Sequence, residues 1–171
     1  MTGAKSIKVW GTQLYLKPAS DSKAVQIGFH RDSEHVNCFS KGMLTAWIPL
    51  NRMQKNSGMI QFVRGSHKWP VEFKNTHAGF SDIFTQRRLL MEETGELDWD
   101  ERIAQVELGG LSFHHGDVVH ASGLNLSGKD RCVLTVGLIT DETIFIKKND
   151  SYGLEEILDD PVSCPQIYKR N

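Results

Sequence analysis

Cysteine is scarce in this sequence. The three cysteines, Cys38, Cys132 and Cys164, are odd in number and widely spaced, so they fit neither a disulfide framework nor a Cys-x-x-Cys metal site. A reducing compartment is the simpler interpretation. Long apolar runs are also missing, because no unbroken stretch approaches the ~20 residues that span a bilayer, and the opening MTGAKSIKVW has no apolar signal core. We expect a cytoplasmic protein that does not enter a membrane.

An excess of charge of either sign is absent as well. Lys and Arg together number 20 and Asp and Glu 21, which gives a formal net charge of −1. This balance disfavours a basic nucleic-acid-binding protein and a polybasic membrane binder. The sequence has no internal repeat, low-complexity tract or linker rich in Pro, Gly or Ser. We therefore expect a single domain over residues 1–171, long enough to bury a hydrophobic core without disulfide bonds or a structural metal.

Short stretches with β character recur along the chain, and turn-forming residues separate them. Because no helix intervenes at each step, the pattern favours a sandwich or barrel over a βαβ fold. The stretches predicted as strands are 9–16, 25–29, 43–50, 59–63, 104–108, 110–113, 118–119, 132–139 and 143–146.

One region, residues 77–103, interrupts the β pattern. From about residue 81 its composition turns to Arg, Leu, Met and Glu, with Ile83, Arg87, Leu90 and Met91 at helical spacing. We expect a helical insert here. It is either a lid that covers the metal site described below and contributes to substrate choice, or a solvated connecting helix.

The segment His30-Arg31-Asp32 follows the apolar run 25–29 directly. On an extended segment, residues i and i+2 point to the same face, so His30 and Asp32 can reach one metal ion together. A third ligand from elsewhere would complete a set of two histidines and one carboxylate. Such a set leaves coordination positions open and suits non-haem Fe(II) oxygen chemistry. Alone, the H-x-D motif identifies no metal site.

A second segment makes the pattern specific. Together, GFHRDSE and VVHASGLNLSGKDRCVL resemble the phytanoyl-CoA dioxygenase family of 2-oxoglutarate-dependent oxygenases. In that family, H-x-D is followed by H-x-S-x-x-N and by an arginine eleven residues after the histidine, as His120 and Arg131 are spaced here. The segments 44–50, 56–58 and 65–67 resemble the family's tryptophan strand, N-x-G turn and G-S-H segment in the same order.

The resemblance implies an all-β core with a small helical insert, folded as a double-stranded β-helix (a cupin-like jelly roll), with Fe(II) near its open end. It implies that His30, Asp32 and His120 are the iron ligands. Arg131 would bind the distal carboxylate of 2-oxoglutarate, because its planar guanidinium matches two oxygens at once. Ser122, two residues after His120, would face the same cavity and donate to that carboxylate.

Further candidates for the cosubstrate pocket lie on neighbouring strands. Trp47 and Thr45 share one strand face, and the resemblance implies that Trp47 lines the pocket, with a core tryptophan as the alternative. Gln13, on the strand before the metal motif, is a third candidate. Only one of His114 and His115 can face inward on a strand, and neither is assigned a role. The remaining histidines at positions 35, 67 and 77 are expected at the surface or in turns.

The activity implied is hydroxylation of an unactivated C–H bond of a small organic substrate, using Fe(II), 2-oxoglutarate and O2 and releasing succinate and CO2. Asp32 favours hydroxylation over halogenation, since a halide would need its coordination position. Two other interpretations stay open: a non-catalytic jelly-roll protein that binds small molecules, and a cupin-type metal enzyme that needs no Arg131. Family members usually carry a further N-terminal segment, so this sequence is expected to be a short member, a fragment or an alternative product.

Overall fold

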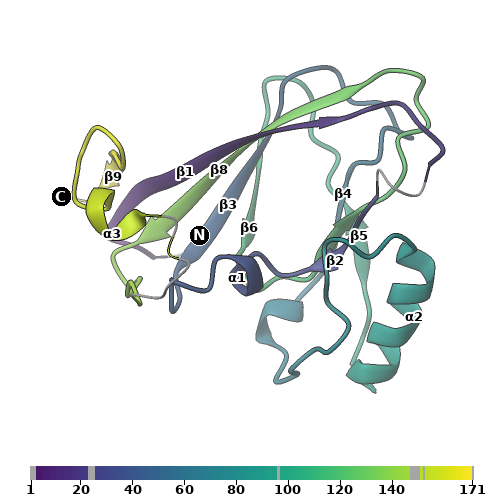
Figure 1. The fold of residues 1–171 in the computed structure, drawn as a ribbon, viewed down its shortest axis with the longest axis horizontal. Helices are drawn as coiled ribbons and strands as arrows, with labels where there is room; N and C mark the ends of the chain where they lie inside the picture. Colours follow the sequence, from purple (N-terminus) through teal and green to yellow (C-terminus); the bar gives the residue numbers. More distant parts are fainter. Residues whose placement is uncertain (1–2, 23–25, 96, 147–150, 152, 171) are drawn as a thin grey trace.

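The computed structural model is built around two antiparallel β-sheets (Figure 1). It describes residues 3–22, 26–95, 97–146, 151 and 153–170. The larger sheet has the strand order β6-β3-β8-β1-β9 and the smaller sheet the order β2-β7-β4-β5. The strands are β1 Ser6–Lys17, β2 Ile27–His30, β3 Met43–Pro49, β4 Ile60–Val63, β5 Glu101–Ile103, β6 Ser112–His115, β7 His120–Ser122, β8 Arg131–Thr140 and β9 Gln166–Lys169.

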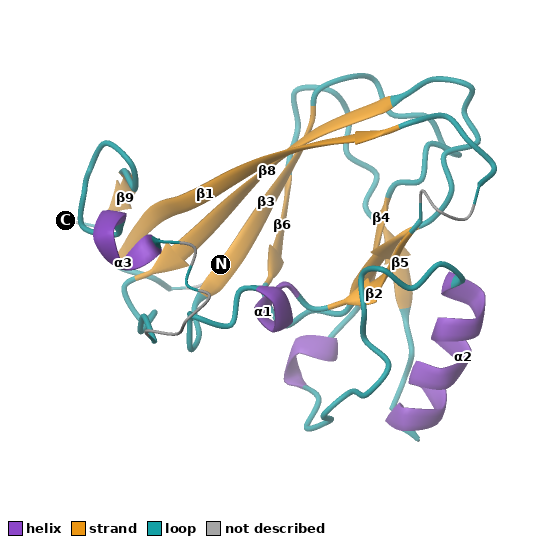
Figure 2. Ribbon diagram, viewed as in Figure 1, coloured by secondary structure: helices purple, strands orange, loops and turns teal. Residues whose placement is uncertain are grey.

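Among the described residues, helical structure consists of short segments and one longer helix (Figure 2). These are α1 Asp32–His35, the 3-10 turn η2 Ser66–Lys68, α2 Ile83–Thr94 and α3 Leu154–Ile157. In the described part of the chain, no helix is both long and apolar enough to cross a membrane. The architecture confirms the prediction of an all-β core with few helices.

Some of the predicted strands are not strands. The stretches 104–108 and 143–146 are irregular, and 118–119 forms a bend just before β7. Some of their apolar side chains pack without a continuous strand: the partly buried Ala104 packs against one buried cluster, and the partly buried Phe145, which forms an isolated bridge with Phe39, packs against another. Strand β9 was not predicted. Residue 25, the first of the predicted strand 25–29, lies outside the described residues.

The larger sheet is organised around the long pair β1 and β8, whose register runs from Ile7 opposite Thr140 to Lys17 opposite Arg131. Trp10 of β1 lies flat against Gly137 of β8, where a Cβ atom would stand 2.4 Å from the tryptophan ring. Only glycine leaves room for this contact. Trp10 thereby becomes part of the wall of the central cavity.

The two faces of the smaller sheet have different partners, because successive side chains on a strand alternate. His30 and His120 lie opposite each other in the β2–β7 pair, and Phe62 lies opposite His120 in the β7–β4 pair. These side chains face the larger sheet. Phe29 and Ala121, the sequence neighbours of the two histidines, belong to a buried cluster with Ile83 and Leu90 of α2 on the other face.

Helix α2 is attached to that other face (Figure 1). It begins after Asp82, whose side chain accepts the backbone N–H groups of Phe84 and Thr85. The Gln86 side chain accepts the N–H of Phe29 at 2.6 Å and donates to the Phe29 carbonyl at 2.7 Å. These bonds tie the helix to the edge strand β2.

The helix that we predicted within residues 77–103 is present, but it does not cover the metal-ligand candidates. It packs behind β2 and β7, whereas His30 and His120 point toward the larger sheet. Among the described residues of 77–103, only Ala78 and Gly79 line the central cavity. The prediction that this helix is a lid over the metal is therefore wrong, because alternation along β2 turns the helix-bound face away from the site.

Candidate active site

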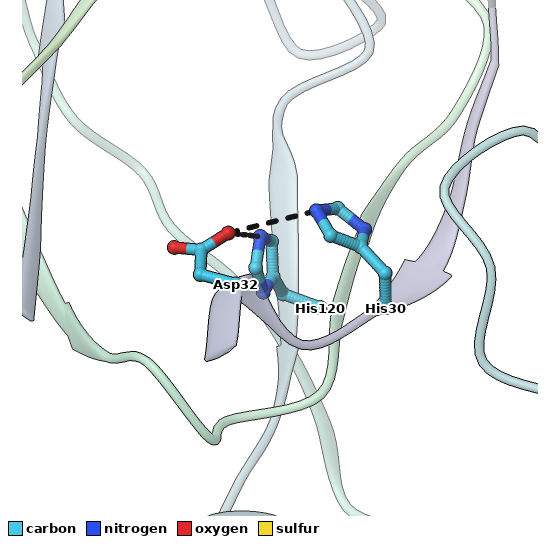
Figure 3. A group of neighbouring side chains, drawn as sticks. All are labelled: His30, Asp32 and His120. Carbon is cyan, nitrogen blue, oxygen red and sulfur yellow. Dashed lines mark ion pairs between the residues drawn. The ribbon is translucent and has the colours of Figure 1, made fainter. Parts of the chain in front are cut away.

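Three side chains converge between the sheets at the end of β2 (Figure 3). One ligand atom from each of His30, Asp32 and His120 lies within 4.8 Å of the other two. Asp32 Oδ1 stands 3.7 Å from His30 Nε2 and 3.5 Å from His120 Nε2. The strand pair β2–β7 places the two histidines, and Asp32 is added where the chain leaves β2 and enters α1. The sequence prediction that these residues come together is confirmed.

Backbone carbonyl groups set the orientation of both imidazole rings. His30 Nδ1 lies 2.8 Å from the Gly28 carbonyl, and His120 Nδ1 lies 3.0 Å from the Val118 carbonyl. A carbonyl oxygen only accepts, so each Nδ1 carries the hydrogen and donates it. The lone pair of each Nε2 is left facing the centre of the group, as in histidines that bind metals.

The charge states of the three residues suit metal binding. Burial lowers the pKa of both His30 and His120 below the ordinary 6.5, which favours the neutral rings. Burial alone would raise the pKa of Asp32. The hydrogen bonds from His114 and from the Thr45 hydroxyl act against this effect, and the pKa of Asp32 lies below its ordinary value. The group therefore presents two neutral nitrogen donors and one carboxylate.

The second oxygen of Asp32 has partners on the larger sheet. Thr45 Oγ1 donates to Asp32 Oδ2 at 2.6 Å, and His114 Nε2 lies 3.0 Å from the same oxygen. Thr45 on β3 and His114 on β6 are register partners. Of the two adjacent histidines, His114 faces the site and is buried, whereas His115 lies near His67 outside it.

Two buried cations lie elsewhere in the same region. Arg131 is 3% exposed and donates through Nη1 to the Gly58 carbonyl and, at 3.0 Å, to Ser122 Oγ. Lys17, its register partner on β1, donates to Ser122 Oγ at 2.6 Å and to the Gly123 carbonyl at 2.6 Å. Within the described part of the chain, the hydrogen-bond partners of both cations are hydroxyl and carbonyl oxygens, and neither cation is paired with a carboxylate.

This environment changes the basicity of both groups. Burial and then the neighbouring Arg131 lower the pKa of Lys17 to about 7, and burial lowers the pKa of Arg131 to about 10. The Ser122 hydroxyl accepts from both cations and donates to the Gly58 carbonyl at 2.7 Å. Gly58 sits in the N-x-G turn, where a Cβ would come within 2.6 Å of the Gly123 carbonyl. Only glycine fits at this position, and its carbonyl accepts hydrogen bonds from Arg131 and Ser122.

A cavity of about 780 Å³ connects the two groups. All eight residues predicted for the site line this cavity: His30, Asp32, His120, Arg131, Ser122, Trp47, Thr45 and Gln13. Gln13 is exposed, and its side-chain oxygen accepts the Tyr15 hydroxyl at 2.5 Å. The Thr45 hydroxyl donates to Asp32, so Thr45 belongs to the group of metal-ligand candidates and not to the cationic pocket.

Sequence reasoning missed several residues of the cavity region. No motif in the sequence singled out Lys17. Its side chain lies on the same strand face as those of Gln13 and Tyr15, because alternate residues of a strand point the same way. His114 was left unassigned. His35, expected at the surface, is exposed but also lines the cavity, with its ring centroid 5.5 Å from that of His30.

Solved structures with a similar fold include two enzymes of nogalamycin biosynthesis. The non-haem alpha-ketoglutarate-dependent epimerase SnoN matches with a TM-score of 0.64 and 19% identity, over 88% of this chain and 54% of that one. The carbocyclase SnoK matches with a TM-score of 0.65 and 19% identity, over 91% and 58%. SnoN in complex with Fe3+, alpha-ketoglutarate and nogalamycin RO gives 0.64 and 21%, over 86% and 55%. At these identities the likeness concerns the fold.

Two comparisons of the sequence identify relatives of this chain. A protein of Danio rerio described as phytanoyl-CoA dioxygenase domain-containing protein 1 is 27% identical over 128 residues, which is 67% of this chain and 40% of that protein. The chain thus spans less than half of this relative and little more than half of the solved structures. The family described as Phytanoyl-CoA dioxygenase (PhyH) matches residues 3–133. Since this match extends over most of the chain, the chain belongs to the phytanoyl-CoA dioxygenase (PhyH) family.

Proposed function

We propose that this chain is an Fe(II)- and 2-oxoglutarate-dependent oxygenase that hydroxylates an unactivated C–H bond of a small organic substrate. The observation that carries the proposal is the convergence of His30, Asp32 and His120 in one cavity with a buried cationic pocket. Two neutral imidazoles and one carboxylate form a donor set that suits Fe(II) and leaves coordination positions open. The histidines would bind through Nε2 and Asp32 through Oδ1.

The cationic pocket fits the distal carboxylate of 2-oxoglutarate. Lys17 and Arg131 are buried without a carboxylate partner in the described structure, and Arg131 Nε has no hydrogen-bond partner there. Buried charges without a counter-charge are costly, so an anion in the pocket would offset that cost. Ser122 would join by turning its hydroxyl from Gly58 toward the anion. Trp47, whose ring centroid lies 5.7 Å from Arg131 Cζ, would form one wall.

When bound, Fe(II) together with 2-oxoglutarate and O2 supplies the oxidising chemistry, in which 2-oxoglutarate becomes succinate and CO2 and the substrate gains a hydroxyl group. The chain's own residues would hold the ligand atoms in place. We propose hydroxylation rather than halogenation because Asp32 occupies the position that a halide would need. The neighbours described as an epimerase and a carbocyclase of nogalamycin biosynthesis support a small-molecule substrate.

The test is succinate formation by the purified chain with Fe(II), 2-oxoglutarate and O2, screened against acyl-CoA esters, compatible solutes, phosphonates and natural products. We expect slow succinate formation alone and faster formation with a true substrate, whose product gains one oxygen atom. A product of unchanged mass would indicate epimerisation instead. Binding of Fe(II) and 2-oxoglutarate without succinate would indicate a non-catalytic binding protein. Binding of Fe(II) with no effect of 2-oxoglutarate would favour a cupin-type metal enzyme.

A further inference from the structure

We propose that His114 and Thr45 are positioning residues that hold Asp32 so that a single carboxylate oxygen, Oδ1, faces the metal; this inference rests on the metal site of the proposed function. Both residues form hydrogen bonds with Asp32, and the His114 ring also lies beside that of His120, with 4.7 Å between the ring centroids. They act through the carboxylate.

The two oxygens of Asp32 have separate surroundings (Figure 3). Oδ1 faces the two ring nitrogens, at 3.5 Å from His120 Nε2 and 3.7 Å from His30 Nε2. Oδ2 points away from them and is bonded by Thr45 Oγ1 at 2.6 Å and by His114 Nε2 at 3.0 Å. An ionised carboxylate only accepts, so both partners donate to Oδ2. Rotation of the carboxylate would break both hydrogen bonds.

The fold makes these donors rigid. Thr45 and His114 face each other across the β3–β6 pair of the larger sheet, whereas Asp32 follows β2 of the smaller sheet. The His114 side chain is 4% exposed, and its ring centroid lies 5.0 Å from that of Phe62. Donors on the larger sheet therefore hold Asp32, which follows a strand of the smaller sheet. Polar partners of this kind, behind the ligands, orient them and tune metal affinity.

The arrangement has a consequence for coordination. A carboxylate that is free to turn can chelate a metal through both oxygens and so occupy an additional position. With Oδ2 held by two donors, Asp32 offers Oδ1 alone and leaves that position for the cosubstrate or O2. His114 is not itself a fourth ligand in this arrangement, because its Nε2 is used by Asp32 and it lies outside the group of converging ligand atoms.

The test is anaerobic titration of the full chain with Co(II), followed by its visible absorption spectrum, which responds to the number and geometry of ligands. His114→Phe keeps the ring but removes the donor, and Thr45→Val keeps the shape but removes the hydroxyl. We expect each single variant to weaken Co(II) binding and the double variant to weaken it by ~10–100-fold. Each single variant should also alter the absorption spectrum of the bound Co(II). The matched variants His114→Gln and Thr45→Ser keep a donor and should restore affinity and spectrum toward those of the unaltered chain.

Asp32→Ala separates this inference from the proposed function. If Asp32→Ala abolishes Co(II) binding but the double variant binds Co(II) with unaltered affinity and spectrum, the positioning role is overturned and the metal site stands. If Asp32→Ala binds Co(II) normally, the metal site itself is wrong. Should His114→Phe fail to fold, the pair Thr45→Val and Thr45→Ser still decides, because equal behaviour of those two variants would contradict the role of the hydroxyl.

Discussion

At one end of the cavity a single carboxylate faces two neutral imidazoles. Arg131 lies at the other end, and in the described structure Arg131 and its neighbour Lys17 donate only to hydroxyl and carbonyl oxygens. The first group is already held in place: backbone carbonyls orient both rings, and two donors fix Asp32. The second group has hydrogen bonds but no counter-charge. The two ends therefore differ in how their charges are balanced: two donors hold the carboxylate of the metal end, whereas an anion at the cationic end would add electrostatic stabilisation.

The largest effect is expected from breaking the metal end. Asp32→Ala removes the anionic ligand, so Fe(II) binding should be strongly weakened and product formation abolished. Calorimetric titration with Fe(II) under anaerobic conditions and a succinate assay provide the measurements. His67→Ala is the control, because His67 is exposed and absent from the cavity wall. Equal losses in the two variants would contradict the assignment of the metal ligands.

Breaking the cationic end should leave the metal end intact. Removing one partner of a buried charge pair costs on the order of 2–5 kcal/mol, which corresponds to roughly thirty-fold to several thousand-fold in affinity. Arg131→Ala should therefore weaken 2-oxoglutarate binding by a factor in this range and leave Fe(II) affinity almost unchanged. The exposed Arg52→Ala is the matched control. Unchanged cosubstrate affinity in Arg131→Ala would refute the role assigned to Arg131.

The lowered pKa of Lys17 predicts that the stability of the chain depends on pH above neutrality. Its pKa is lowered from 10.5 to about 7 in the folded chain. Between these values the unfolded chain binds more protons than the folded chain, so this residue should make the free energy of unfolding rise with pH. Urea unfolding at a series of pH values should show a smaller rise in Lys17→Met. Saturating 2-oxoglutarate should also reduce the rise, because an anion raises the pKa of Lys17. An identical slope in both proteins would contradict the placement of Lys17.

The smallest effects are expected at helix α2, outside the cavity. Arg87 is half-buried and pairs through two nitrogens with Glu101, whereas Arg88 makes an exposed i,i+4 pair with Glu92. Arg87→Ala should lower the free energy of unfolding by about 1–2 kcal/mol, and Arg88→Ala by about 0.5 kcal/mol or less.

Neither α2 variant should change 2-oxoglutarate affinity. Chemical unfolding and cosubstrate titration measure the two quantities. A selective loss of substrate turnover in Arg87→Ala, with stability unaltered, would revive the idea of a lid.

His30 and Asp32 could be paired from the sequence because H-x-D is a local pattern on an extended segment. His120 and Arg131 were identified by the resemblance to the family, whose second motif has the same spacing. The places of Lys17 and His114 in the site depend on the register between paired strands. Lys17 acquires its place only because β1 runs antiparallel to β8 with Lys17 opposite Arg131. His114 likewise reaches Asp32 because β6 pairs with β3, and no periodicity within one segment reveals such pairings.

The same limit explains the error about the helix. Its existence follows from local composition, and its buried residues Ile83, Gln86, Leu90 and Thr94 repeat at helical spacing. The face of the smaller sheet that it covers is the one where Phe29 and Ala121 pack against Ile83 and Leu90, a contact between residues far apart in the sequence. Apolar segments such as 104–108 can pack in a core without pairing as strands, so hydrophobicity alone misassigned them.

The most direct measurement is the visible spectrum of the chain with Fe(II) and 2-oxoglutarate under anaerobic conditions. The account predicts a weak charge-transfer band that requires both components, is lost in Asp32→Ala, and needs far more 2-oxoglutarate in Arg131→Ala. Absence of the band in the unaltered folded chain, or its full persistence in Asp32→Ala, would contradict the claim that one cavity binds the metal at one end and the cosubstrate carboxylate at the other.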